Sequence, residues 1–275
     1  MVRVTSTDRR AALRAGAGLV AGGAFAGACS TSGSASGPSS GAPPGPPSSV
    51  PSGSPSFGPS APTSPRAAPA PRAFPGQPAQ ITHGPRGRPR VALTFHGQGE
   101  PALAETLLGE AERHGARVTV LAVGTWLDAH PGLARRILDG GHDIGNHTHR
   151  HLDINAMPEA RARAEIEECA LRLKRLTGSV GTWFRPSRTA RASPLVERLA
   201  RAAGYPHVLS YDVDSLDFTS PGATAVTANV LREVRDGSVV SLHFGYADTV
   251  AALPAVLDGL TRRGLRAVTT TELIG

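Results

Sequence analysis

Three of the ten histidines in this 275-residue chain fall within five positions, as His147, His149 and His151. Neutral imidazole is a favoured ligand of zinc, so this cluster indicates a metal site. His147 and His151 would share one face of a helical turn, whereas all three would share one face of an extended segment. The residues alone leave both arrangements open, and also a solvated polar loop without a metal.

The elements that must position these residues alternate between strands and helices from residue 90 onward. Seven strand-like runs are predicted, at 90–95, 117–123, 142–147, 182–185, 207–213, 238–244 and 265–269. Because strands that alternate with helices pair in parallel, the pattern predicts an α/β fold. About 185 residues are few for an eight-fold barrel. We therefore expect a distorted or incomplete (β/α) barrel of about seven strands, with a doubly wound sheet as the alternative.

Four strand ends of this barrel carry side chains that can do chemistry. They are His96 after the first strand, the histidine cluster after the third, Asp214 after the fifth and His243 at the end of the sixth. In (β/α) barrels the loops that follow the strands carry the functional residues. We therefore expect these side chains to gather at one end of the barrel.

The order of the motifs resembles the NodB-type polysaccharide deacetylases, carbohydrate esterase family 4. Five blocks come in the family order and together cover essentially residues 90–275. The blocks are Val91–Gly97, Gly141–His151, Phe184–Pro186, Tyr211–Phe218 and Gly237–His243. The resemblance implies a distorted (β/α) barrel with a divalent metal ion, usually zinc. It also implies removal of N- or O-acetyl groups from polysaccharides such as peptidoglycan, chitin-like or xylan-like chains.

The resemblance further implies a role for each matched position. His147 and His151 are implied to be metal ligands, and Arg185 to orient the catalytic base. His243 is implied to be the general acid, with Asp214 as the carboxylate that tunes it. In such a site the metal polarises the acetyl carbonyl and its bound water. A base takes the proton of that water, and the acid protonates the leaving nitrogen or oxygen.

The chain departs from the family pattern at the end of the first strand. The family has Asp-Asp there, the first as general base and the second as metal ligand, whereas this chain has His96-Gly97. Two hypotheses follow. Either His96 is a third metal ligand beside His147 and His151, or His96 is the base and the metal keeps two protein ligands. The resemblance implies that the Arg185 guanidinium faces His96, where its positive charge would lower the pKa of His96, and a neutral imidazole suits both roles.

Smaller departures lie elsewhere in the same blocks. Ser187-Arg188 stands where the family often has an aromatic residue and Gly, Phe218 where a Trp lines the acetyl pocket, and Ser241 where Leu is usual. Cys169, in a long predicted helix at 158–176, is expected to be a buried small hydrophobe.

Because the catalytic motif is altered, two functions compete. One is an altered metal-dependent deacetylase of an acetylated cell-wall or extracellular glycan. The other is a catalytically inactive glycan-binding protein of the same fold.

The first 87 residues differ from the rest in composition. Residues 1–29 pass from a polar stretch with Arg9-Arg10 through a mildly apolar stretch to small residues before Cys29. This order resembles a twin-arginine secretory signal that ends in a lipobox. Residues 30–87 are rich in Pro, Ser and Gly, which predicts a disordered spacer before a domain at 88–275. We expect the chain to lie outside the cytoplasm, secreted or held to the membrane only by a lipid on Cys29.

The formal net charge of +7 belongs mostly to that N-terminal segment. Residues 1–87 hold seven Arg against one acid, and residues 88–275 hold 22 basic against 21 acidic residues. The predicted domain thus lacks the basic excess of a nucleic-acid-binding domain, and no nucleic-acid partner is expected. No run of about 18 apolar residues predicts a spanning helix. Two cysteines are too few for a disulfide-rich scaffold or a multi-Cys zinc site.

Overall fold

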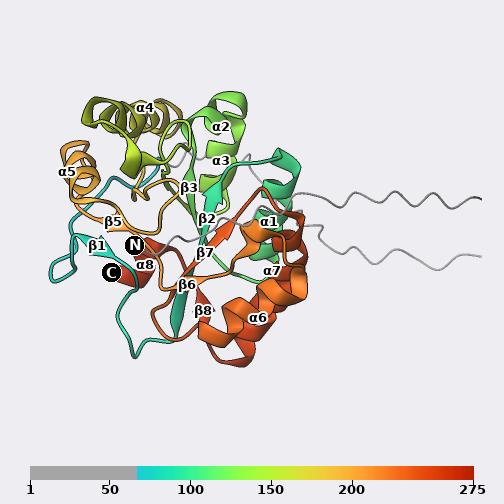
Figure 1. Ribbon diagram of the computed structural model, residues 1–275. Helices are drawn as coiled ribbons and strands as arrows, with labels where there is room; N and C mark the ends of the chain where they lie inside the picture. The colour runs from blue at the N-terminus through green and yellow to red at the C-terminus, as the bar shows by residue number, and fades with distance from the viewer. Residues whose placement is uncertain (1–66) are drawn as a thin grey trace, which may run out of the picture. The chain divides into compact units, whose positions relative to one another are not determined.

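The computed structural model describes residues 67–275 as strands that alternate with helices (Figure 1). The strands are β1 (Gln80–Ile81), β2 (Arg90–Gly97), β3 (Thr119–Ala122), β4 (Asp143–Asn146), β5 (Val208–Leu209), β6 (Val213–Asp214), β7 (Val239–His243) and β8 (Arg266–Ala267). The α-helices are α1 (Pro101–Arg113), α2 (Gly124–Ala129), α3 (Gly132–Asp139), α4 (Glu159–Thr177), α5 (Pro194–Ala202), α6 (Ala223–Glu233), α7 (Ala247–Arg262) and α8 (Thr270–Ile274). Two 3-10 turns are η1 (Ile154–Ala156) and η2 (Asp217–Thr219).

All pairings between the named strands are parallel. The main sheet has the order β4-β3-β2-β7-β6, β8 pairs with the beginning of β2, and β1 pairs with β5. Single parallel bridges at Phe184 link β4 to β5, through Asn146 on one side and Val208 on the other. This arrangement is the distorted (β/α) barrel that the sequence predicts, and that prediction is confirmed.

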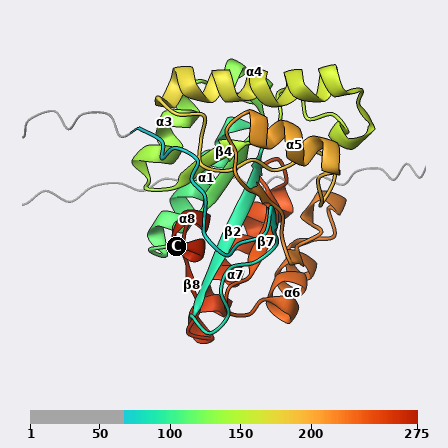
Figure 2. The same ribbon diagram turned by 90° about the vertical axis from the view of Figure 1, so that its left-hand side faces the viewer.

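Side-chain alternation along β2 decides what the barrel interior contains. Val91, Leu93 and Phe95 pack in the apolar cluster beneath the outer helices, which includes residues of α1, α3 and α7. Figure 2 shows β2 and β7 in the middle, with α4 and α5 on one side and α6 and α7 on the other. Because successive side chains of a strand point to opposite faces, Thr94 and His96 lie on the inner face. The alternation thus carries His96 into the barrel at the end of the strand.

Two predicted strands differ from the structure. The run 182–185 forms only the bridges at Phe184, and the run 207–213 is divided into β5 and β6. The guanidinium of Arg185 donates to the carbonyl oxygens of Leu209 and Ser210 at the point where the run 207–213 is divided, so a side chain satisfies these buried carbonyl groups there.

Helix α4 carries the lone cysteine of the described part of the chain. Cys169 is completely buried, and its thiol donates to the carbonyl oxygen of Ala122 at 3.4 Å. Burial raises the pKa of the thiol to about 12, so it stays protonated and unreactive at neutral pH. The helix ends at Gly178, whose left-handed φ of 79° suits a residue without a Cβ. Cys169 therefore packs as a small hydrophobe, as the sequence predicts.

Residues 67–87 belong to the folded part, and the predicted spacer boundary at residue 87 is wrong. Phe74 stacks on Trp183 with ring centroids 5.2 Å apart, and its backbone N–H donates to Nε2 of His207 at 2.9 Å. Ile81 is completely buried, and β1 pairs with β5. The composition of this stretch resembles a spacer, but two apolar side chains and one short strand suffice to dock it.

The predicted signal, Cys29 and the spacer up to residue 66 lie outside the described residues. Within 67–275, no helix is both long enough and apolar enough to cross a membrane.

Candidate active site

The carboxyl ends of the parallel strands bring five predicted residues together. The ring centroids of His96 and His147 lie 4.4 Å apart, those of His96 and His243 4.2 Å apart, and those of His147 and His151 4.9 Å apart. The guanidinium of Arg185 contacts Nε2 of His96. Two adjoining cavities of about 340 and 390 Å³ open beside the rings, and His96, His151 and His243 line both.

His147 is held in the form that a metal ligand needs. Its Nδ1–H donates to the carbonyl oxygen of Arg185 at 3.0 Å, which leaves the lone pair on Nε2. That Nε2 is buried and has no hydrogen-bond partner. Burial, more than the neighbouring His151, holds the pKa of His147 well below its ordinary value, so the ring is neutral. A buried lone pair without a partner fits a metal ion and is costly without one.

The loop after β4 separates the three clustered histidines. Asn146 anchors it by donating to Ile166 O and Tyr205 Oη and by accepting from the backbone N–H of Thr148. Thr148 and His151 both have left-handed backbones, with φ of 68° and 56°. The loop is thus neither the helical turn nor the extended segment considered from the sequence.

Left-handed non-glycine residues cost about 1–3 kcal/mol each and often occur at functional sites. Here the bends turn His151 toward His147, whereas His149 turns away, with its Nε2 3.4 Å from a carboxylate oxygen of Glu168. Burial lowers the pKa of His151 to about 4, so this ring is neutral as well. Two of the three clustered histidines therefore face the site.

Arg185 is completely buried and has no carboxylate in contact with its guanidinium within residues 67–275. It donates to the carbonyl oxygens of Leu209 at 3.2 Å and Ser210 at 2.9 Å, and to Nε2 of His96 at 3.2 Å. Burial lowers the pKa of the guanidinium to about 10, which leaves it charged at neutral pH. Arg185 thus contacts the residue in the base position.

Gly97 leaves no space for a ligand side chain. A Cβ on this residue would lie 2.9 Å from Cγ1 of Val120 and 3.0 Å from Cα of Ala122. The family's second Asp has no counterpart here, and atoms of β3 fill the space that its side chain would need.

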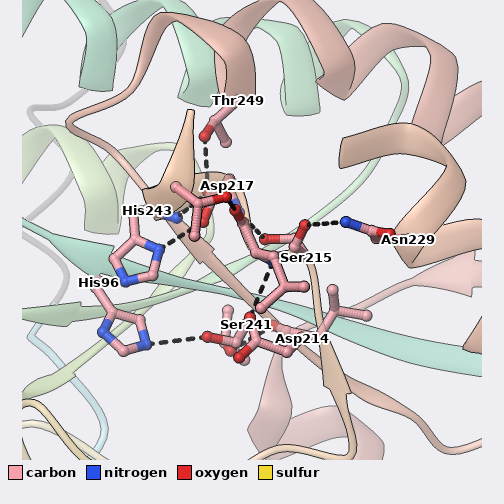
Figure 3. Close-up of polar contacts among 12 residues, drawn as sticks. His96, Asp214, Ser215, Asp217, Asn229, Ser241, His243 and Thr249 are labelled. Atoms are coloured by element: carbon pink, nitrogen blue, oxygen red, sulfur yellow. Dashed lines mark hydrogen bonds and ion pairs between the residues drawn. The ribbon is translucent and has the colours of Figure 1, made fainter. Parts of the chain in front are cut away.

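His243 has a buried carboxylate partner, which is Asp217 and not Asp214 (Figure 3). Asp217 accepts from Nδ1 and from the backbone N–H of His243, each at 2.7 Å, and from Oγ1 of Thr249 at 2.6 Å. Asp214 instead accepts from the backbone N–H of Leu216 at 3.0 Å. The implied assignment of Asp214 as the partner of His243 is therefore wrong.

The geometry of the turn explains this correction. Strand β6 ends at Asp214, and Leu216 then takes a left-handed backbone with φ of 55°. This bend returns η2 toward β7, so that Asp217 faces His243. Thr249 was missed from the sequence. Its signal was a single polar side chain on the otherwise apolar face of α7, where Ala252, Leu253 and Val256 are buried.

The donor set fits a divalent cation. One nitrogen from each of His96, His147 and His151 lies within 4.8 Å of the others. Imidazole nitrogens suit zinc among the common divalent ions. His147 and His151 offer neutral rings, whereas the lone pair on Nε2 of His96 already accepts from Arg185. The fit is therefore good at two positions, and zinc would be held by His147 and His151 before His96.

Zinc binding to the full chain is expected to depend on His147 and not on His149. Replacing His147 by Ala removes the buried, partnerless Nε2, and we expect a loss of zinc affinity of at least about 10–100-fold. His149→Ala is the matched control in the same loop, and we expect little change from it. Isothermal titration with zinc measures both. Equal losses in the two variants would show that the loop does not bind metal as the structure places it.

The fold and this site define a class, the NodB-type carbohydrate esterases. The family model described as polysaccharide deacetylase matches residues 83–208. A chitooligosaccharide deacetylase of Rhizobium leguminosarum bv. phaseoli is 30% identical over 213 residues, which cover 70% of this chain and 92% of that protein. The chain belongs to the polysaccharide deacetylase family.

Other relatives agree with this assignment. A peptidoglycan-N-acetylglucosamine deacetylase of Bacillus cereus is 29% identical over 194 residues, with 69% of this chain and 90% of that protein covered. A solved peptidoglycan N-acetylglucosamine deacetylase has a TM-score of 0.67 and 26% identity, over 71% of this chain and 92% of that one. A pseudoenzyme of carbohydrate esterase family 4 from Bacillus anthracis has a TM-score of 0.68 at 22% identity, over 72% and 70%, which shows the shared fold.

Proposed function

We propose that this protein removes acetyl groups from an acetylated cell-wall or extracellular glycan, with His243 as its one proton-transfer residue. The observation that carries the proposal is the hydrogen bond between Asp217 and His243. The ring of His243 lines the cavities, and its centroid lies 4.2 Å from that of His96. Relatives named for deacetylation of peptidoglycan and of chitooligosaccharides support an acetylated polysaccharide as the substrate class.

Position 96 has no carboxylate to act as a base. We therefore assign both proton transfers to His243. Asp217 accepts the Nδ1–H of His243, so Nε2 holds the lone pair. As water adds to the acetyl carbonyl carbon, Nε2 takes its proton, and Asp217 stabilises the imidazolium that forms. The imidazolium then returns the proton to the sugar nitrogen or oxygen, the bond from that atom to the acetyl carbon breaks, and acetate leaves. A divalent metal at His147 and His151, when bound, supplies polarisation of the acetyl carbonyl.

Acetate release by the full chain tests this proposal. The substrates are peptidoglycan fragments, chitooligosaccharides and acetylated xylan, each with and without added zinc, and free acetate is the product measured. We expect release from at least one of these classes. If none of them yields acetate from zinc-supplied protein, the deacetylase proposal fails.

A location outside the cytoplasm is also a proposal, supported by the N-terminal residues alone. The twin-arginine pair and the small residues before Cys29 favour export and a lipid anchor. Full-length protein that stays in the cytoplasmic fraction of its host would contradict this location.

The second candidate function is glycan binding without turnover, and Gly97 is the observation that favours it. The ligand carboxylate of the family is absent, and the packing of β3 occupies its space. Wild-type acetate release that a chelator inhibits would contradict this candidate. Release that appears only after His96-Gly97 is replaced by Asp-Asp would support it.

The change at Gly97 is by itself expected to lower the free energy of unfolding. Gly97→Ala already places a Cβ 2.9 Å from Val120, and we expect it to destabilise the fold by about 1–3 kcal/mol through overpacking. Gly109→Ala is the matched control, because Gly109 lies in α1 with open space around its missing Cβ. Urea unfolding of the two variants measures the difference. A Gly97→Ala protein as stable as Gly109→Ala would show that position 97 can accept a side chain.

A further inference from the structure

Two of the departures from the family pattern, at positions 96 and 241, contact each other. Ser241, in place of the usual Leu, has its Oγ 3.2 Å from Nε2 of His96, which stands in the base position (Figure 3). Arg185 donates through NH1 to the same Nε2 at 3.2 Å. Both ring hydrogen bonds of His96 are thus made by one nitrogen.

These contacts determine which nitrogen of His96 carries its proton. A guanidinium has only donors, so the nitrogen that it contacts must present a lone pair. An imidazolium, or a neutral ring protonated at Nε2, would place an N–H against the N–H of Arg185. The Ser241 hydroxyl can orient its proton toward the same lone pair, which Arg185 and Ser241 then share. His96 is therefore neutral, with its proton on Nδ1.

The protonated nitrogen has no partner in the protein. Within residues 67–275, both hydrogen bonds of the His96 ring involve Nε2, and no hydrogen bond reaches Nδ1. Nδ1 is not completely buried, so a ligand can reach it. His96 lines both cavities, and its ring lies between those of His147 and His243. The site thus presents an N–H donor to whatever occupies the cavities beside the proton-transfer residue.

We propose that His96 donates a hydrogen bond from Nδ1 to an oxygen of the bound acetyl group and of the acetate product, and is neither metal ligand nor base. An N–H at this position stabilises negative charge on a carbonyl oxygen, whereas the family's carboxylate would repel it. Arg185 and Ser241 are then positioning residues that hold the donor form of the ring. The identification of an acetyl oxygen as the acceptor rests on the proposed function. The assignment of the proton to Nδ1 rests only on the contacts of Arg185 and Ser241.

Nuclear magnetic resonance of the full chain labelled with ¹⁵N-histidine tests the proposal. Two-bond ¹H–¹⁵N correlations report which ring nitrogen carries the proton, and His96→Asn identifies the His96 signals by their disappearance. We expect Nδ1–H and a shift of this signal on titration with acetate. A proton on Nε2 overturns the proposal, as does a Nδ1 signal that moves with zinc and not with acetate.

Two amide variants distinguish the nitrogens by position. The amide of His96→Asn lies near the place of Nδ1 and keeps a donor there, whereas the amide of His96→Gln lies near the place of Nε2. We expect acetate affinity to stay within about threefold in His96→Asn and to fall at least about tenfold in His96→Gln, the loss of one hydrogen bond to a charged group. The reverse order overturns the proposal, and His149→Asn is the control.

This design separates the donor role from the proposed function. Acetate binding at Nδ1 without release of acetate from any substrate refutes the deacetylase and leaves the donor role intact. Acetate release without any response of Nδ1 to acetate refutes the donor role and leaves the deacetylase intact.

Discussion

Replacing Asp217 by Asn is expected to lower kcat for acetate release by about 10²–10⁴-fold, the usual contribution of a general acid–base group. The carboxylate of Asp217 accepts Nδ1–H from His243, which leaves the lone pair of Nε2 for the proton of water. The Asn amide can donate to Nδ1 instead, and Nε2 would then carry a proton and could not act as a base. His243→Ala should lose activity to a similar extent, because it removes the proton carrier itself.

Asp214→Asn is the matched comparison, since the two acids lie three positions apart. Asp214 accepts from the backbone N–H of Leu216 and does not contact His243. We expect kcat to change only a few-fold in this variant, about 1 kcal/mol or less in barrier. Initial rates over a range of substrate concentrations separate kcat from KM, and an unfolding curve shows that each variant is folded. A larger loss in Asp214→Asn than in Asp217→Asn would return the role to Asp214.

A chain that begins at residue 88 is expected to lose its cooperative unfolding transition. The cut removes Phe74, Ile81 and β1, and it exposes the face of Trp183 on which Phe74 stacks. Loss of a single buried Phe side chain costs about 3–5 kcal/mol. Loss of a buried Ile costs about 2–5 kcal/mol more. The two losses together approach the whole stability of a typical domain, about 5–15 kcal/mol.

A chain that begins at residue 67 is the control, since it keeps every described contact. Circular dichroism during urea unfolding compares the two chains, and Phe74→Ala in the longer chain isolates the contribution of one side chain. Equal unfolding midpoints for the chains that begin at 67 and 88 would show that the N-terminal segment adds nothing to the fold. Any measurement on an isolated domain should therefore begin at residue 67 or earlier.

Much of the fold follows from local patterns. Strand runs that alternate with helical runs lead to parallel pairing, and parallel strands end at the same side of a barrel. The types and order of His96, His147, His151, Arg185 and His243 were therefore enough to predict that these residues meet. Their individual roles stay predictions, and the variants above address them.

Contacts between distant segments decided the rest. Left-handed bends at Thr148, His151 and Leu216 selected His151 over His149 and Asp217 over Asp214, and a bend of this kind in a non-glycine residue leaves no mark in a periodic pattern. Phe74 docks on Trp183, more than a hundred positions away, although its surroundings have the composition of a spacer.

The site chemistry divides in the same way. The residues by themselves determined that a His-Gly pair stands where the family has two carboxylates, and that the two histidines that the family resemblance implies to be metal ligands are present. Only the tertiary structure decided which nitrogen of His96 carries the proton. The guanidinium of Arg185 donates to Nε2, which leaves the proton on Nδ1. A side chain's type is written in the sequence, but its protonated atom depends on which donor the fold places beside it.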